Sequence, residues 1–130
     1  MQRFDDVRRD EGVTYVAMRI PGAHHAVVDP FKVLNYLLSA EHTIGRHKAL
    51  FFATLGYRRN TWQDLMNALV RHATEDTAVL VEETIFGAKY AIVAPMTGPN
   101  GRTSIIVSVW IVRTEETFPR LVTAYPRRLR

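Results

Sequence analysis

The sequence predicts an α+β domain in which N-terminal helices pack on one face of a four-stranded antiparallel meander sheet. Between residues 30 and 74, apolar residues recur every three or four positions, which is typical of amphipathic helices. From Thr77 onward they alternate with polar residues, as they do in strands. A turn-forming cluster at residues 97–101 divides this second half, and such tight turns join antiparallel neighbours.

The first helix is expected over residues 31–39. Asp29 and Pro30 precede it, and a carboxylate at the N-cap followed by proline is a common helix start. The apolar residues that we expect to face the core are Phe31, Leu34, Leu37 and Leu38.

The second helix is expected over residues 45–55, with Gly56 as the glycine that ends it. At about 100° per residue, its apolar stripe contains Ile44, Phe51, Phe52 and Leu55, and the last three are expected to pack on the sheet. Lys48 lies in the middle of this stripe. Its ammonium group either extends to the solvent or lies in a cleft where it meets an anion, and the sequence leaves both alternatives open.

The third helix is expected over residues 62–74. Asn60 and Thr61 each offer an N-cap, and an amide or carboxylate side chain stands three positions after each, as in a capping box. Its inner stripe contains Trp62, Leu65, Met66 and Leu69. His72, near the end of this helix, is interpreted as structural or incidental.

Four strands are expected, over residues 78–86, 89–94, 103–112 and 120–125, with the third near the centre of the sheet. In the last strand, the period of two places Leu121, Thr123 and Tyr125 on one face. If that face meets the helices, the two hydroxyl groups share a cleft with Lys48 and His47. The alternative is that threonine and tyrosine are simply good strand formers.

The 130 residues are expected to form one domain, over residues 26–126. Residues 1–25 form an N-terminal arm, in which residues 13–20 have strand chemistry and end at a Pro-Gly turn. Residues 127–130 form a basic tail.

Composition excludes several classes of function. The absence of cysteine rules out disulfides, thiolate metal sites and cysteine nucleophiles. No apolar run approaches the ~20 residues of a membrane helix, and the N-terminus has no secretory segment, so we expect a cytoplasmic protein without a membrane partner. The pair His24-His25 has no further ligand at metal-binding spacing, so neither a metal nor another cofactor is expected. The net charge of +4 favours a polyanionic partner.

Several motifs between residues 27 and 126 resemble an uncharacterised bacterial domain family of unknown function. They include His-x-x-Gly-Arg-x-Lys-Ala-x-Phe-Phe from His42, Thr-Gly-Pro-Asn-Gly-Arg from Thr97, Val-Trp at residues 109–110, and Leu-Val-Thr-Ala-Tyr-Pro from Leu121. Two positions depart from the family pattern. Thr43 replaces a proline, and His47 stands where a small polar residue is common, which shifts the expected catalytic role toward His42, Arg46 and Lys48.

The resemblance implies membership of the toxin-associated repertoire of bacteria and a layout similar to the barnase, colicin and RelE-like ribonucleases. Those domains cleave RNA without a metal, using basic and hydroxyl-bearing residues between a helix and the sheet. A neutralising antitoxin or immunity protein is the implied partner.

The first functional hypothesis is therefore a metal-independent ribonuclease that uses a ribose 2′-OH to attack the adjacent phosphate. In it, His42 or His47 acts as base or acid, because imidazole titrates near neutral pH. Cations and hydroxyls would hold or orient the phosphate, and the candidates are Arg46, Lys48, Thr123 and Tyr125. Further RNA contacts are expected from Arg58, Arg59 and Arg102. The alternative is a non-catalytic binding module whose basic surface meets RNA or an acidic protein.

Overall fold

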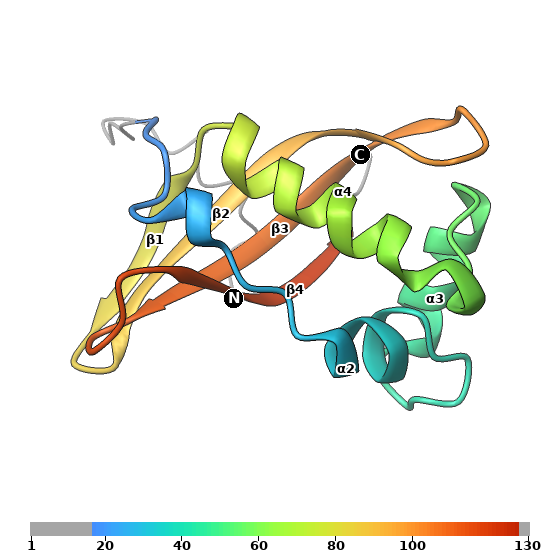
Figure 1. Cartoon of the computed structure of the whole chain (residues 1–130), viewed down its shortest axis with the longest axis horizontal. Coiled ribbons are helices and arrows are strands. Elements are labelled where there is room, and N and C mark those ends of the chain that lie inside the picture. The colour runs from blue at the N-terminus through green and yellow to red at the C-terminus, as the bar shows by residue number, and fades with distance from the viewer. Residues whose placement is uncertain (1–16, 128–130) are drawn as a thin grey trace.

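The computed structural model describes residues 17–127 and shows helices followed by a sheet (Figure 1). The helical elements are η1 (Ala23–His25), α2 (Pro30–Lys32), η2 (Val33–Leu37), α3 (Arg46–Thr54), η3 (Arg59–Thr61) and α4 (Trp62–Glu75). The strands are β1 (Val79–Thr84), β2 (Gly87–Thr97), β3 (Thr103–Arg113) and β4 (Pro119–Pro126). The predicted α+β class is confirmed.

The strands form one sheet in the order β1-β2-β3-β4, and each pair of neighbours is antiparallel. The predicted meander is confirmed, and β3 lies inside the sheet as expected. The Gly98–Gly101 turn closes the β2–β3 hairpin through a hydrogen bond from the Gly98 amide to the Arg102 carbonyl (2.9 Å). Gly101 has a φ of 86°, a conformation that favours glycine.

Helix α4 covers one face of the sheet (Figure 1). Its buried residues Leu65, Ala68 and Leu69 join a core with residues from β2, β3 and β4. The largest side chain in that core is Trp110, which is fully buried. Burying such apolar surface is the main source of stability in a domain of this size.

The first helical segment differs from its predicted form because it is irregular. The α-helical turn α2 passes into η2, which has π-helical hydrogen bonding, so the residues no longer follow a period of 3.6. As a result Phe31 is 71% exposed and Val33 is fully buried, and the expected core position of Phe31 is wrong. Leu37 and Leu38 are buried as predicted.

Helix α3 begins and ends close to the predicted bounds, but its main packing partner is η2 rather than the sheet, on which it was expected to pack. It packs on η2, and its last residues meet the β2–β3 turn, where the Asn100 side chain donates to the Thr54 carbonyl (2.9 Å). Phe52 and Leu55 are buried and Phe51 is half-buried, whereas Ile44 is 65% exposed. The predicted place of Ile44 on the apolar stripe is therefore wrong, because Ile44 precedes the helix and turns outward.

The start of α4 also differs in detail. Thr61 is the N-cap, but its side chain makes no capping hydrogen bond, so the predicted capping box is not formed. The 3-10 turn η3 immediately precedes the helix, and the Thr61 amide donates within that turn to the Arg58 carbonyl (3.2 Å). The chain enters the helix through this turn rather than through a side-chain cap.

Strand β4 contains a bulge that changes which side chains share a face. Val109 pairs with Thr123, but its neighbour Trp110 pairs with Leu121, so Val122 is an additional residue in β4. Leu121 consequently lies in the core beneath the helices. Thr123 and Tyr125, which pair with Val109 and Val107, lie on the other face. The prediction that Leu121, Thr123 and Tyr125 share one face is therefore wrong.

Strand β4 is an edge strand, and the segment before α2 closes part of its free edge. Val27 pairs with this edge in parallel, donating to the Pro119 carbonyl (2.8 Å) and accepting from the Leu121 amide (3.0 Å). The next free carbonyl, that of Val122, accepts a hydrogen bond from the Lys32 ammonium (3.0 Å). Such coverage protects the edge from pairing with another chain.

The arm expected before residue 26 is described only in part. Met18 forms an antiparallel bridge with Ala78, with backbone hydrogen bonds in both directions. Residues 13–16 of the expected extra strand lie outside the described residues, as do residues 128–130 of the basic tail.

Candidate active site at the edge of the sheet

Lys48 extends its ammonium group between two tyrosine rings. The Nζ atom lies 5.7 Å from the ring centroid of Tyr36 in η2 and 5.5 Å from that of Tyr125 in β4. Both distances are within the range of a cation–π interaction. Among the described residues, no carboxylate lies within ion-pair distance of Lys48. The ammonium is therefore held in place by aromatic rings while its charge stays available to an anion.

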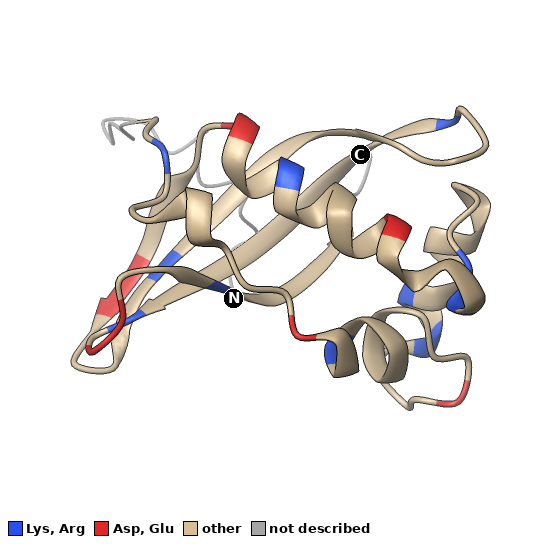
Figure 2. Ribbon diagram, viewed as in Figure 1, with Lys and Arg blue, Asp and Glu red and all other residues tan. Residues whose placement is uncertain are grey.

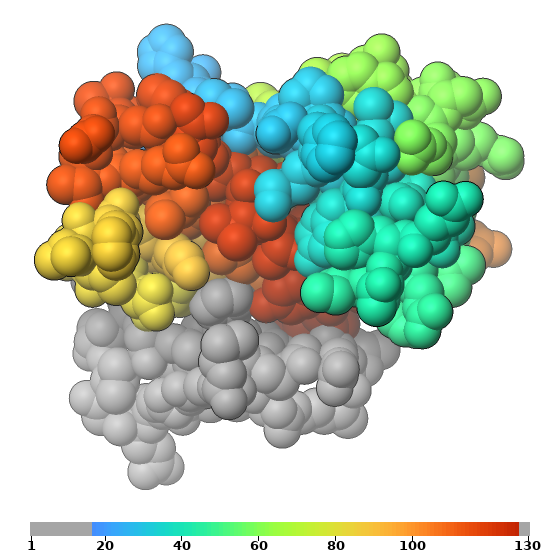
Figure 3. Space-filling model, turned by 90° about the horizontal axis from the view of Figure 1, so that it is seen from below, coloured from blue at the N-terminus to red at the C-terminus, as the bar shows by residue number. Residues whose placement is uncertain are grey.

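Tyr36 is the residue on which the other candidate side chains converge. Its hydroxyl group forms a hydrogen bond with the Thr123 hydroxyl (3.2 Å), and its ring also lies 5.6 Å from the Lys32 Nζ atom. The space-filling view shows the segment of α2 and η2 beside the red surface of β4 (Figure 3). The bulge at Val122 explains this contact, because it turns Thr123 away from the α4 face toward the face that Tyr36 reaches around the sheet edge.

His42 has a structural task and faces the same tyrosine. Its Nδ1 atom accepts hydrogen bonds from the amides of Ile44 (3.0 Å) and Gly45 (2.9 Å), so it caps the turn that leads into α3. Because Nδ1 is an acceptor, the neutral ring carries its proton on Nε2. The ring contacts Tyr36 edge-on, with centroids 5.1 Å apart. Its Nε2–H is therefore a hydrogen-bond donor.

A close backbone contact fixes the start of α3 against η2. A Cβ atom at Gly45 would lie 2.0 Å from the Tyr36 carbonyl oxygen, so only glycine allows this approach. The contact brings the segment that carries His42 and Lys48 against Tyr36. This close backbone contact explains why the His-x-x-Gly-Arg motif has a glycine at position 45.

The other predicted site residues are not brought into this cluster. Arg46 and His47 are exposed on the first turn of α3, and neither has a side-chain hydrogen bond or ion pair among the described residues. The Arg59 guanidinium donates to the Leu34 carbonyl, while Arg58 and Arg102 are exposed. Lysine and arginine residues gather on α3 and the loop after it, whereas acidic residues gather on β1 and the β3–β4 loop (Figure 2).

Sequence reasoning missed Tyr36. It directly precedes Leu37 and Leu38, and a tyrosine beside buried leucines is more often a core residue than a site residue. Its contact with Thr123 joins positions 87 residues apart. No periodicity within one element reveals such a pairing.

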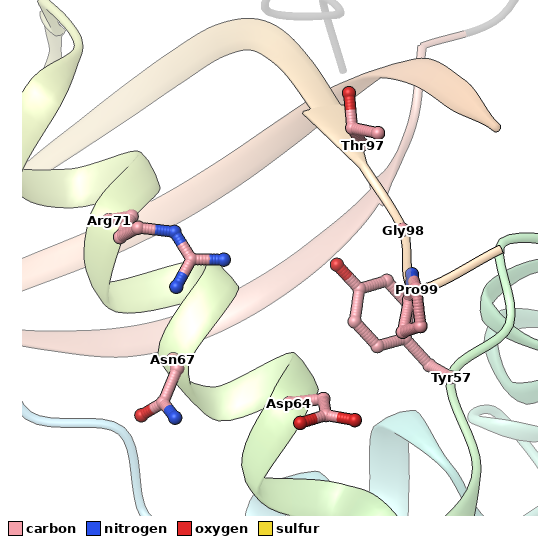
Figure 4. Close-up of a pocket in the computed structure, with 7 residues that line it drawn as sticks. All are labelled: Tyr57, Asp64, Asn67, Arg71, Thr97, Gly98 and Pro99. Carbon is pink, nitrogen blue, oxygen red and sulfur yellow. The ribbon is translucent and has the colours of Figure 1, made fainter. Parts of the chain in front are cut away.

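A separate cleft was also missed. It lies between α4 and the end of β2, has a volume of about 280 Å³, and is lined by Tyr57, Asp64, Asn67, Arg71, Thr97, Gly98 and Pro99 (Figure 4). Asp64, Asn67 and Arg71 are spaced three and four residues apart, so they share one face of the helix. That spacing of polar residues beside the apolar stripe was the available signal.

Within residues 17–127, no three His, Asp or Glu side chains lie close enough together to hold a metal ion. None of the helices in this part of the chain is long and apolar enough to cross a bilayer.

The family described as "Domain of unknown function (DUF6883)" matches residues 19–128. The chain belongs to this family. The match includes every element of the α+β fold and both sites of this DUF6883 domain. Among curated proteins, none matches the chain.

One solved structure similar to this DUF6883 domain is titled "Contact-dependent growth inhibition toxin - immunity protein complex from Klebsiella pneumoniae 342". The match has a TM-score of 0.61 and 22% sequence identity, and it covers 82% of this chain and 97% of the other. At this identity the likeness establishes a shared fold.

Proposed function

We propose that this DUF6883 domain is a metal-independent ribonuclease whose active site surrounds Tyr36. The observation that carries the proposal is the convergence of a cation, a hydroxyl and an imidazole on this one ring: Lys48, Thr123 and His42 all contact it. The three groups come from α3, β4 and the loop before α3. Convergence of such groups from separate elements is typical of active sites.

The proposed reaction is attack of a ribose 2′-oxygen on the adjacent phosphorus. The new O2′–P bond forms, the P–O5′ bond breaks, and the product ends in a 2′,3′-cyclic phosphate. A base removes the 2′-proton, and the leaving 5′-oxygen takes up a proton. Additional negative charge develops on the phosphate oxygens, and preorganised cations and donors that stabilise it supply much of the rate acceleration.

The geometry supports distinct roles for the residues. The Lys48 ammonium stabilises the phosphate charge, and the Tyr36–Thr123 hydroxyl pair orients a phosphate oxygen, with Tyr125 holding the ammonium. The Nε2–H of His42 suits a hydrogen-bond donor rather than a base, since accepting a proton there requires loss of the cap at Nδ1. His47, the other imidazole, precedes Lys48 on α3 but is exposed outside the cluster. On this proposal it accepts the 2′-proton through one water molecule, and the 5′-oxygen takes its proton from water.

Arg46, Arg58, Arg59 and Arg102 are proposed to contact RNA phosphates outside the reacting linkage. Arg46 is the first residue of α3, Arg58 and Arg59 lie in the connection between α3 and α4, and Arg102 lies on the β2–β3 turn. Guanidinium groups bind phosphate oxygens in bidentate fashion. Their binding energy would make cleavage depend on ionic strength.

The likeness to a chain of a toxin–immunity complex supports a role in a system of this kind. We propose the toxin role because the Tyr36 cluster brings together the groups that RNA cleavage needs. On this proposal, the partner is an immunity protein or antitoxin that covers the basic site with acidic residues. Cytoplasmic RNA is the proposed substrate.

The test is cleavage of labelled RNA in the presence of a chelator. The wild-type protein should cleave and leave cyclic phosphate ends, and Lys48→Met should lower the rate about 10²–10³-fold. Lys89→Met is the matched control, because Lys89 lies on β2 and faces Glu82 at 3.8 Å. Full activity of Lys48→Met would place the site elsewhere, and loss of folding in this variant would make Lys48 a structural residue.

A binding module without catalysis is the alternative, and the exposed arginines outside the Tyr36 cluster favour it. In that case the protein binds RNA or an acidic protein but leaves RNA intact. Arginine substitutions would then weaken binding, while Lys48→Met would have no larger effect than they do.

A further inference from the structure

The cleft between α4 and β2 is independent of the Tyr36 cluster. The cluster involves β4, at one edge of the sheet, whereas the cleft is lined by α4, Tyr57, the last residue of β2 and the turn after it. Figure 4 shows Asp64, Asn67 and Arg71 projecting from α4, with Tyr57 and Pro99 opposite them.

Tyr57 gives the strongest sign that this cleft receives a ligand. The residue is only 3% exposed, yet its hydroxyl group has no hydrogen-bond partner among the described residues. Figure 4 shows this hydroxyl pointing into the cleft toward Arg71. A buried polar group without a partner costs free energy, so such groups are rare unless something binds them.

The charges in the cleft are separated along the helix. Arg71 and Asp64 are seven residues apart, or about 10 Å along the axis, and Asn67 lies between them. Among the described residues, neither forms an ion pair. Burial raises the pKa of the Tyr57 hydroxyl, Arg71 opposes this effect, and Asp64 adds to it, which agrees with both charges lying near Tyr57. The hydroxyl therefore stays protonated and can donate.

The geometry points to a binding site for one guanine nucleotide, with the phosphate at Arg71 and Tyr57 and the base at Asp64. At the Arg71 end of the cleft, the guanidinium, the Asn67 amide and the Tyr57 hydroxyl offer hydrogen-bond donors, which suit phosphate oxygens. The Asp64 carboxylate only accepts. Guanine is the base that presents two adjacent N–H donors, at N1 and N2, to one carboxylate, whereas the other bases present a single group.

The size and lining of the cleft agree with this ligand. A volume of about 280 Å³ holds one nucleotide rather than a longer strand. Pro99 offers an apolar surface against which a flat base can pack. The nucleotide can be free or can belong to an RNA chain, and both sources share the same chemistry.

The experiment is titration of the full chain with GMP and AMP, followed by calorimetry or NMR. GMP should bind more tightly than AMP. Asp64→Asn should abolish that preference while AMP binding stays, and Arg71→Gln should weaken both nucleotides about tenfold or more. The matched controls are Glu83→Gln on β1 and Arg113→Gln on β3. They change exposed charges at the end of the sheet away from the cleft and should bind GMP like the wild type.

Tyr57→Phe separates binding from folding. The substitution removes a buried hydroxyl that has no protein partner, so the free protein should be at least as stable in thermal unfolding, while GMP binding weakens. An RNA pentamer with a single guanosine identifies the source of the nucleotide. If the pentamer competes with GMP for this site, RNA enters the cleft. If it does not compete, the site prefers the free nucleotide.

Two results would overturn the inference: no saturable binding of GMP, or unchanged affinity in Asp64→Asn and Arg71→Gln together. Lys48→Met should retain GMP binding. A failure of the ribonuclease proposal would therefore leave this site intact, and the reverse also holds.

Discussion

The buried histidine of α4 makes the stability of the fold depend on pH. His72 is 3% exposed, and both ring nitrogens have partners: the Ser108 hydroxyl at 2.7 Å from Nδ1 and the Ala94 carbonyl at 3.1 Å from Nε2. Since a carbonyl only accepts, Nε2 carries the proton and Nδ1 accepts from Ser108. The Ser108 oxygen in turn accepts from the Trp110 indole (2.8 Å). Every polar atom of this chain of hydrogen bonds is satisfied only while His72 is neutral.

Burial lowers the pKa of His72 below 6.5, and the Ala94 carbonyl and Asp76 oppose this shift only in part. As the pH falls through 6.5, the unfolded chain takes up a proton that the folded chain does not, so stability falls until the pH reaches the folded pKa. If His72 remains neutral in the fold, the loss between about pH 7.5 and 5.5 is about 1.4 kcal/mol.

Urea denaturation of the wild type and of His72→Gln across this pH range measures the effect. Glutamine can still donate to Ala94 and accept from Ser108, but it does not titrate, so the variant should lose about 1.4 kcal/mol less stability on acidification. His25→Gln, at an exposed histidine, should behave like the wild type. Equal pH slopes for the wild type and His72→Gln would refute the assignment of a neutral buried ring.

Two further predictions concern α3. Phe52 is fully buried against the rings of Phe51 and Tyr57. Phe52→Ala should therefore lower the free energy of unfolding by about 3–5 kcal/mol in chemical denaturation. A loss below about 1 kcal/mol would contradict this packing of Phe52. His42→Ala removes the acceptor for two amides and should destabilise by about 1 kcal/mol. His42→Asn restores an acceptor without an imidazole, so stability should return while RNA cleavage stays low. Recovery of cleavage in His42→Asn would limit His42 to its capping role.

The sheet was predictable because its signals are local. Alternation along residues 103–112 and the glycine-rich turn before them determine the β3 strand and its antiparallel partner, whatever the helices do. The bulge at Val122 was not predictable, because it depends on how β4 aligns with Trp110 on its neighbour. A single additional residue reversed the expected face of Thr123 and Tyr125.

The helical half shows where a fixed period fails. A regular helix with 3.6 residues per turn would place Phe31 in the core, but the π-helical segment η2 widens the turn and buries Val33 instead. In α3 the regular period holds, and Phe52 and Leu55 are buried as expected. The same phase placed Lys48 toward the sheet, and its ammonium does lie beside Tyr125. The catalytic role of that residue stays a prediction.

The two sites lie near opposite ends of one short helix, α3. At its start, Gly45 touches the Tyr36 backbone, and at its end a Cβ atom on Gly98 would lie 2.0 Å from the Leu55 carbonyl oxygen. At both places a glycine lets two backbone segments approach closely, and these two backbone contacts hold α3 between η2 and the β2–β3 turn. The first contact sets the position of Lys48 against Tyr36, and the second sets the position of Tyr57 beside β2. Lys48 is the residue of the apolar stripe that reaches a site, whereas Tyr57 follows the helix. The packing phase of α3 could therefore reveal only Lys48. The cleft beside Tyr57 depends on how the chain after α3 packs against the β2–β3 turn, which no local sequence pattern reveals.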